Sequence, residues 1–87
     1  MGATFTAERG DLFVRAANHT LIPHVEYMTT TDDGEVLATV LYRGFVVMFQ
    51  GPLRHLEATH TFSAKHAVCQ PWTIDFCAAM VRSKAGL

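Results

Sequence analysis

The chain has 87 residues, which is enough for one domain and too few for two. Hydrophobic residues make up 49% of it and charged residues 17%, a balance that excludes intrinsic disorder and predicts a folded core. The seven Lys and Arg residues and the eight Asp and Glu residues are spread along the chain. We therefore expect no nucleic-acid partner, because phosphate recognition needs a concentrated basic face.

We expect a cytoplasmic protein without membrane association. The longest apolar run, residues 45–49, is far shorter than the roughly 20 residues of a membrane span. The first residues lack the basic-then-apolar order of a secretory signal peptide. Small secreted domains usually carry about four or more cysteines, whereas this chain has two, so both thiols are expected to be free.

The N-terminal third predicts short strands separated by turns. Weak alternation of apolar and polar residues favours a strand at 4–8, and a second strand is expected at 12–17, with residues 9–11 as the turn between them. A third strand is expected within 21–30. Because Pro23 has no N–H to donate to a ladder, this strand lies at a sheet edge or begins just after the proline.

A hairpin is the clearest local prediction. Asp33-Gly34 favours the positive φ angles of a tight turn between two β-prone runs. A strand at 35–43 follows it and, after a turn or bulge at Gly44, a strand at 45–50. The last of these is apolar on both faces, as a central strand with cover on both sides would be.

Residues 53–61 fit two structures. Pro52 followed by Leu53 and Leu56 allows a short helix, whereas alternation of apolar and polar residues further along allows a strand. We prefer the strand, with a continuation as far as Cys69 as a further option.

A C-terminal helix is expected from Pro71, which suits a first helical turn, and Arg82 and Lys84 favour its C-terminal end. Its buried stripe is expected to follow the i, i+4, i+7, i+8 spacing of four apolar residues, Trp72, Phe76, Ala79 and Met80, with Ile74, Cys77 and Val81 widening it. Together these elements predict a single α+β domain over residues 1–87. Its antiparallel sheet has four to six strands, with one C-terminal α-helix packed on one face.

The apolar strand surface predicts a homodimer. One helix covers only one face of a sheet, yet both faces carry large apolar side chains, each of which forgoes about 1.5–3 kcal/mol if left in water. Either the sheet curls on itself or its second face meets another chain, and symmetric pairing of identical chains is the commonest solution. A protein partner bound at the sheet face or edge is also expected. The candidate interface residues are Phe45, Val47, Phe49, Leu37 and Leu41.

The chain carries little that indicates catalysis or cofactor binding. No two of the five histidines stand at a chelating i, i+2 or i, i+4 spacing, and no phosphate loop or nucleophile elbow is present, so no metal or cofactor is expected. We therefore expect a non-enzymatic interaction domain. The alternative is a small-molecule-binding or enzymatic domain, in which a helix N-terminus lowers the pKa of the Cys69 thiol. Its pocket between helix and sheet would use His60, His66, Cys69, Trp72 and Phe76.

Overall fold

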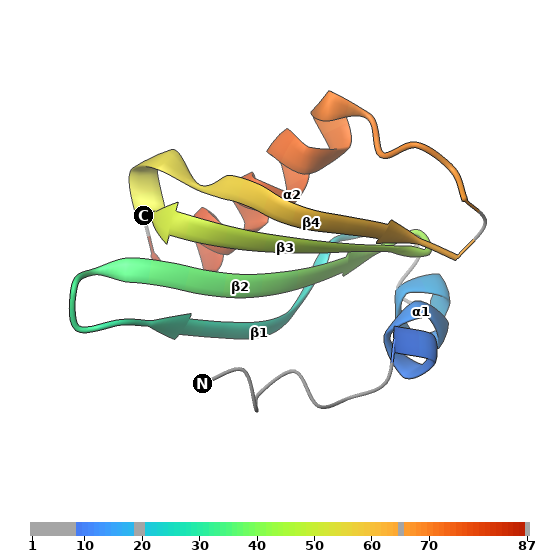
Figure 1. Ribbon diagram of the computed structural model, residues 1–87, viewed down its shortest axis with the longest axis horizontal. Helices are drawn as coiled ribbons and strands as arrows, with labels where there is room; N and C mark the ends of the chain where they lie inside the picture. Colours follow the sequence, from blue (N-terminus) through green and yellow to red (C-terminus); the bar gives the residue numbers. More distant parts are fainter. Residues whose placement is uncertain (1–8, 19–20, 65, 87) are drawn as a thin grey trace.

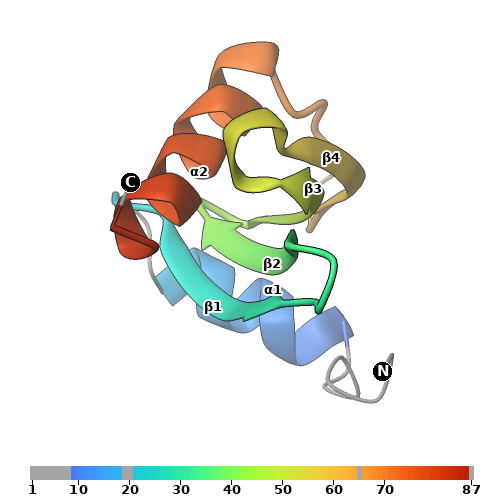
Figure 2. The same cartoon turned by 90° about the vertical axis from the view of Figure 1, so that its left-hand side faces the viewer.

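The computed structural model describes residues 9–18, 21–64 and 66–86. Its elements in chain order are α1 (Arg9–Asn18), β1 (His24–Thr30), β2 (Glu35–Tyr42), β3 (Phe45–Pro52), the 3-10 turn η2 (Leu53–His55), β4 (Glu57–Ser63) and α2 (Pro71–Lys84). The four strands form one antiparallel sheet in the order β1-β2-β3-β4. Helix α2 lies across one face and α1 packs against the other face near one end (Figure 1, Figure 2). The predicted α+β fold with an antiparallel sheet and a C-terminal helix is confirmed.

Two tight turns set the register of the sheet. At the β1–β2 turn, the Gly34 N–H donates to the Thr31 carbonyl at 3.0 Å, and Gly34 has a φ of 85°. At the β2–β3 turn, Arg43 and Gly44 both have positive φ, 50° and 82°, the geometry of a two-residue hairpin whose twist matches that of the strands. Both predicted turns are confirmed.

Helix α1 corrects the N-terminal prediction. Residues 12–17 are helical where a strand was expected, and residues 9–11 form the first helical turn where a turn between strands was expected. The four-residue spacing from Leu12 to Ala16 is the helical signal, and it buries Ala16 completely (0% exposed) against the sheet. A short run of adjacent apolar residues fits a strand equally well, so the helical form of this segment is selected by its contact with the sheet. The strand predicted at 4–8 lies outside the described residues.

The ambiguous stretch after β3 contains both predicted structures in succession. Leu53–His55 form the 3-10 turn, and β4 follows from Glu57 to Ser63 without reaching Cys69. The turn folds tightly against Gly51, whose φ is 133° and where an added Cβ would lie 2.9 Å from the His55 carbonyl oxygen. A glycine is required there.

Both edge strands carry an irregularity. The register between β1 and β2 shifts between Val25 and Tyr27, which leaves Glu26 unpaired across the ladder. The register between β3 and β4 shifts between Met48 and Phe49, where β4 has the extra residue Thr59. Strand β1 begins at His24, directly after Pro23 and at an edge, as the proline predicted.

Helix α2 turns only one part of the predicted stripe to the sheet, the part that contains Cys77 and Val81. Its buried residues are Thr73, Cys77, Ala78 and Val81, whereas Trp72 is 57% and Phe76 40% exposed. Because α2 is apolar around most of its circumference, residue spacing does not select its orientation. Small and branched side chains form the inner face, which lets the helix approach the sheet closely.

Each face of the sheet therefore contributes to a core. One cluster joins α2 to the sheet and contains Val36, Ala38, Val40, Tyr42, Val47, Phe49, Cys77, Ala78 and Val81. The other joins α1 to the sheet through Ala16, Leu41 and Val46, with Leu12, Phe13 and Phe62 packed against them. The expectation that one helix leaves the second face without intramolecular cover is wrong, because α1 covers part of it. No helix in the described part of the chain is long and apolar enough to cross a membrane.

Candidate functional site

The predicted sheet-face interface lies largely inside the chain. Val47 and Phe49 are 0% and 2% exposed in the α2-side core, and Leu41 is 0% exposed beneath α1. Phe45 and Leu37 are half-buried. Three of these side chains already pack inside the chain, so they are not available as an interface for a second copy.

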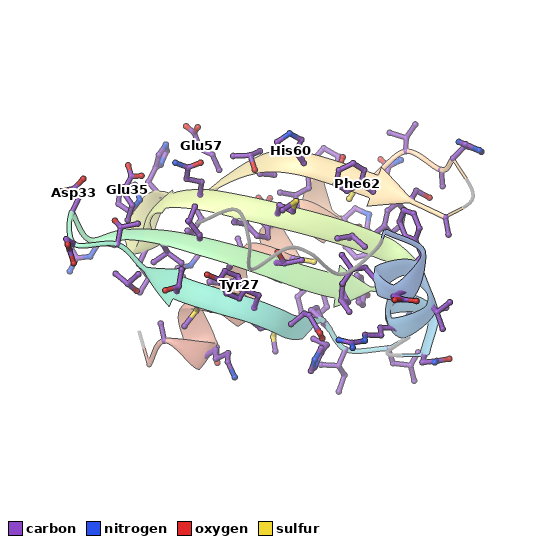
Figure 3. All side chains as sticks on the ribbon, turned by 60° about the horizontal axis from the view of Figure 1, so that its bottom comes forward. Tyr27, Asp33, Glu35, Glu57, His60 and Phe62 are labelled. Carbon is purple, nitrogen blue, oxygen red and sulfur yellow. The ribbon has the colours of Figure 1, made fainter. Side chains whose placement is uncertain are left out.

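The five residues of the predicted pocket are not brought together. His60 stacks on Phe62 with ring centroids 6.1 Å apart, on the α1 side of the sheet (Figure 3). Phe76 meets Tyr42 edge-to-face at 5.6 Å on the α2 side. Trp72 points to solvent, and His66 is exposed in the connection between β4 and α2. These side chains lie on opposite faces of the sheet or point to solvent, so they do not line one pocket.

The two thiols are less reactive than the sequence suggested. Burial raises the pKa of Cys69, opposite to the predicted effect of the helix N-terminus. Burial also raises the pKa of Cys77 to about 12, and the nearby Cys69 adds to this. Both cysteines are free, with Cys69 half-buried and Cys77 buried. A thiol with a raised pKa keeps its proton at neutral pH and is a poor nucleophile.

One ion pair on the surface joins two elements. Glu26 accepts a hydrogen bond from Arg15 Nη1, which ties α1 to β1, and its Oε1 lies 3.1 Å from His24 Nε2. At the other end of the sheet, a hollow of about 270 Å³ includes Glu35 and Glu57 (Figure 3). Within the described ranges, no group of three His, Cys, Asp or Glu side chains is placed to hold a metal ion.

The outward face of α2 carries a compact apolar stripe. At 100° per residue, Trp72, Phe76, Ala79 and Ser83 fall within a sector of roughly 60°, here called the α2 outer stripe. Ala79 and Ser83 are exposed, as are the two aromatic side chains. One flank of the stripe carries Asp75 and Arg82, two turns or about 10 Å apart along the helix.

A pocket of about 380 Å³ lies beside the β2–β3 turn. Its described lining comes from the end of α1, the α1–β1 connection, the turn itself, the end of β4 and the segment after it: Ala17, Leu21, Arg43, Gly44, Phe45, Ser63, Ala64 and Ala67. This turn pocket was not predicted, apart from Phe45, which was assigned to another surface. The Arg43-Gly44 turn was the one signal in the sequence that pointed to this end of the sheet.

Comparisons with protein-family models, with curated proteins and with solved structures find no match for this chain. Function is therefore inferred from the chain's own residues.

Proposed function

We propose that this chain is a non-enzymatic interaction domain that forms a homodimer through the α2 outer stripe. The observation that supports this most directly is the exposure of two large aromatic side chains on one helix face, Trp72 at 57% and Phe76 at 40%. Aromatic residues of this kind supply much of the binding energy at protein interfaces. Val68, four residues before Trp72 and 78% exposed, adds apolar surface next to the start of the helix.

The stripe is complementary to itself in an antiparallel arrangement. When two α2 helices cross about a twofold axis centred between Ala78 and Ala79, Asp75 of each copy faces Arg82 of the other. Neither side chain is paired with another residue in the described part of the chain, so both charges are available for this contact. Ala79 at the centre allows close approach of the helices. Trp72 of each copy then lies across the last turn of the opposite helix.

The proposed interface is small, since it rests on one face of one helix. Contacts of this size lie at the low end of protein interfaces and are typical of transient association. We therefore expect a dimer with a Kd of roughly 10–100 µM, which corresponds to about 5.5–7 kcal/mol. The raised pKa values of both thiols support a binding role over a nucleophilic one.

Sedimentation equilibrium from about 5 to about 500 µM brackets this affinity and gives the mass directly. Trp72 is the only tryptophan, so its emission should shift to shorter wavelength as the dimer forms. Trp72→Ser should abolish the dimer, whereas Val14→Ser, which removes a side chain that is 61% exposed on α1, should leave it intact.

A charge swap tests the antiparallel arrangement itself. Asp75→Arg or Arg82→Asp alone places like charges opposite each other twice and should weaken association about 3- to 10-fold, whereas the double variant should recover it. A mass of one chain at every concentration would overturn the proposal. A double variant that dimerises no more tightly than either single variant would also overturn it. So would tryptophan emission that does not shift with the concentration of this chain and shifts only when a different protein is added.

A further inference from the structure

The turn pocket is built from small side chains around an unfilled space. Ala17, Ala64 and Ala67 line it together with Gly44, and they come from segments far apart in the sequence. The pocket is open to solvent, since none of its described lining residues is buried, and an apolar ligand seated in it would remove apolar wall from water. Leu21 borders the pocket and is 70% exposed, so a bound molecule would cover apolar surface that the chain leaves in water.

The size of the pocket limits what it can hold. Its volume of about 380 Å³ is within the range of small-molecule sites, at the lower end. At about 30 Å³ for a water-sized group, it accommodates roughly a dozen non-hydrogen atoms. An aliphatic chain of about eight to ten carbons with a small polar head fits that count.

The positive charge of Arg43 at the pocket favours a ligand with a negatively charged head group. Arg43 is the one charged residue among the described lining residues. Its guanidinium carbon lies 5.4 Å from the centre of the Tyr42 ring, a cation–π contact that steadies the side chain. The two-residue turn fixes the Arg43 backbone with a φ of 50°. A guanidinium recognises a carboxylate through two parallel hydrogen bonds, which an alcohol or an amine does not reproduce.

We propose that the turn pocket binds a medium-chain aliphatic carboxylate, with its chain against Leu21, Phe45 and the alanines and its carboxylate on Arg43. The α2 outer stripe contributes no described lining residue, so this site is separate from the proposed dimer interface. Either site can exist without the other.

Octanoate, octanol and octylammonium share one chain length and differ in head group, so they separate the role of the charge from that of the apolar walls. Each is titrated into the 87-residue chain, at ligand concentrations below those at which the ligand aggregates, and binding is followed by two-dimensional amide NMR. Octanoate should shift the amides of Gly44, Phe45 and Ala67, with Gly34 at the opposite end of the sheet as an internal control. We expect octanoate to bind at least about five-fold more tightly than the other two, since one charged hydrogen-bonded contact is lost with each of them.

Two variants and a matched control complete the test. Arg43→Gln should weaken octanoate binding about tenfold, the effect of one lost charge-assisted contact, while Arg54→Gln makes the same charge change away from the pocket and should alter it less than about twofold. Ala67→Phe fills the pocket from an exposed position and should abolish binding with the amide spectrum otherwise retained. Equal affinities for the three ligands would overturn the proposal. Unchanged octanoate binding in either pocket variant, or no shifts at the pocket, would do the same.

Discussion

Raising the pH should destabilise this protein through Cys77. The residue is completely buried (0% exposed) between α2 and the sheet, and its pKa rises from 9.0 to about 12 because burial disfavours the thiolate and the nearby Cys69 adds to the effect. The folded chain thus holds this proton more tightly than the unfolded chain. The stabilising contribution is complete below pH 9 and is lost as the pH rises from 9 towards 12.

The size of the loss follows from the two pKa values. A pH of 10.5 is about one and a half units above the pKa of the unfolded thiol, which is then mostly deprotonated, while the folded thiol remains protonated. The free energy of unfolding therefore falls by about 2 kcal/mol relative to pH 8. For a domain of this length, that corresponds to a fall in Tm of about 8–16 °C. Urea unfolding under reducing conditions, followed by circular dichroism at intervals between these pH values, measures it.

Cys77→Val isolates this residue from every other group that titrates in the same range. The variant keeps an apolar side chain of similar size and leaves every other ionisable side chain in place. The wild type should lose about 2 kcal/mol more than the variant between pH 8 and 10.5. Parallel pH profiles for the two proteins would refute the burial of the thiol as described.

Five further substitutions test the packing. Gly51→Ala should lower the free energy of unfolding by about 2 kcal/mol, because the φ of 133° suits glycine and the new Cβ would meet a carbonyl oxygen. Gly10→Ala, at an exposed position of α1, should raise it by about 0.5–1 kcal/mol. Thermal unfolding measures the sign of both changes. Val81→Ser, at a fully buried position, should destabilise by about 3 kcal/mol and Trp72→Ser by less than about 0.5, and equal costs in urea unfolding would contradict the orientation of α2. Thr39→Val should stabilise by about 1 kcal/mol, since the buried Thr39 hydroxyl has no hydrogen-bond partner in the described part of the chain; a loss of stability in the same assay would show that the hydroxyl is satisfied.

The centre of the fold could be predicted from sequence because its signals are local. Gly34 and Gly44 have positive φ angles that few other residues adopt, and their positions fix two hairpins. The strand over 45–50 was predicted as central because it is apolar on both faces, and β3 does lie between two strands with core on both sides. Pro71 marked the start of α2 through the same kind of local constraint.

The existence of α1 and the orientation of α2 could not be predicted, because their signals are tertiary. Leu12, Phe13 and Val14 are consecutive apolar residues, which fit a strand or a helix until Ala16 meets the sheet. In α2, the predicted stripe was centred on large aromatic residues that are exposed, while Cys77 and Val81 from its edge and the small residues near them form the buried face. The turn pocket was missed for the same reason, since its lining converges only in the folded chain.

The bulges in β1 and β4 bear on how copies of this chain can meet without aggregating. Each bulge interrupts the regular row of outward backbone N–H and C=O groups at about the middle of an edge strand, and β1 carries the charge of Glu26 at that point. A further strand could not add in register along the full length of either edge, so open-ended growth into a continuous sheet is discouraged. Association through a helix face, closed by a twofold axis, stops at two chains.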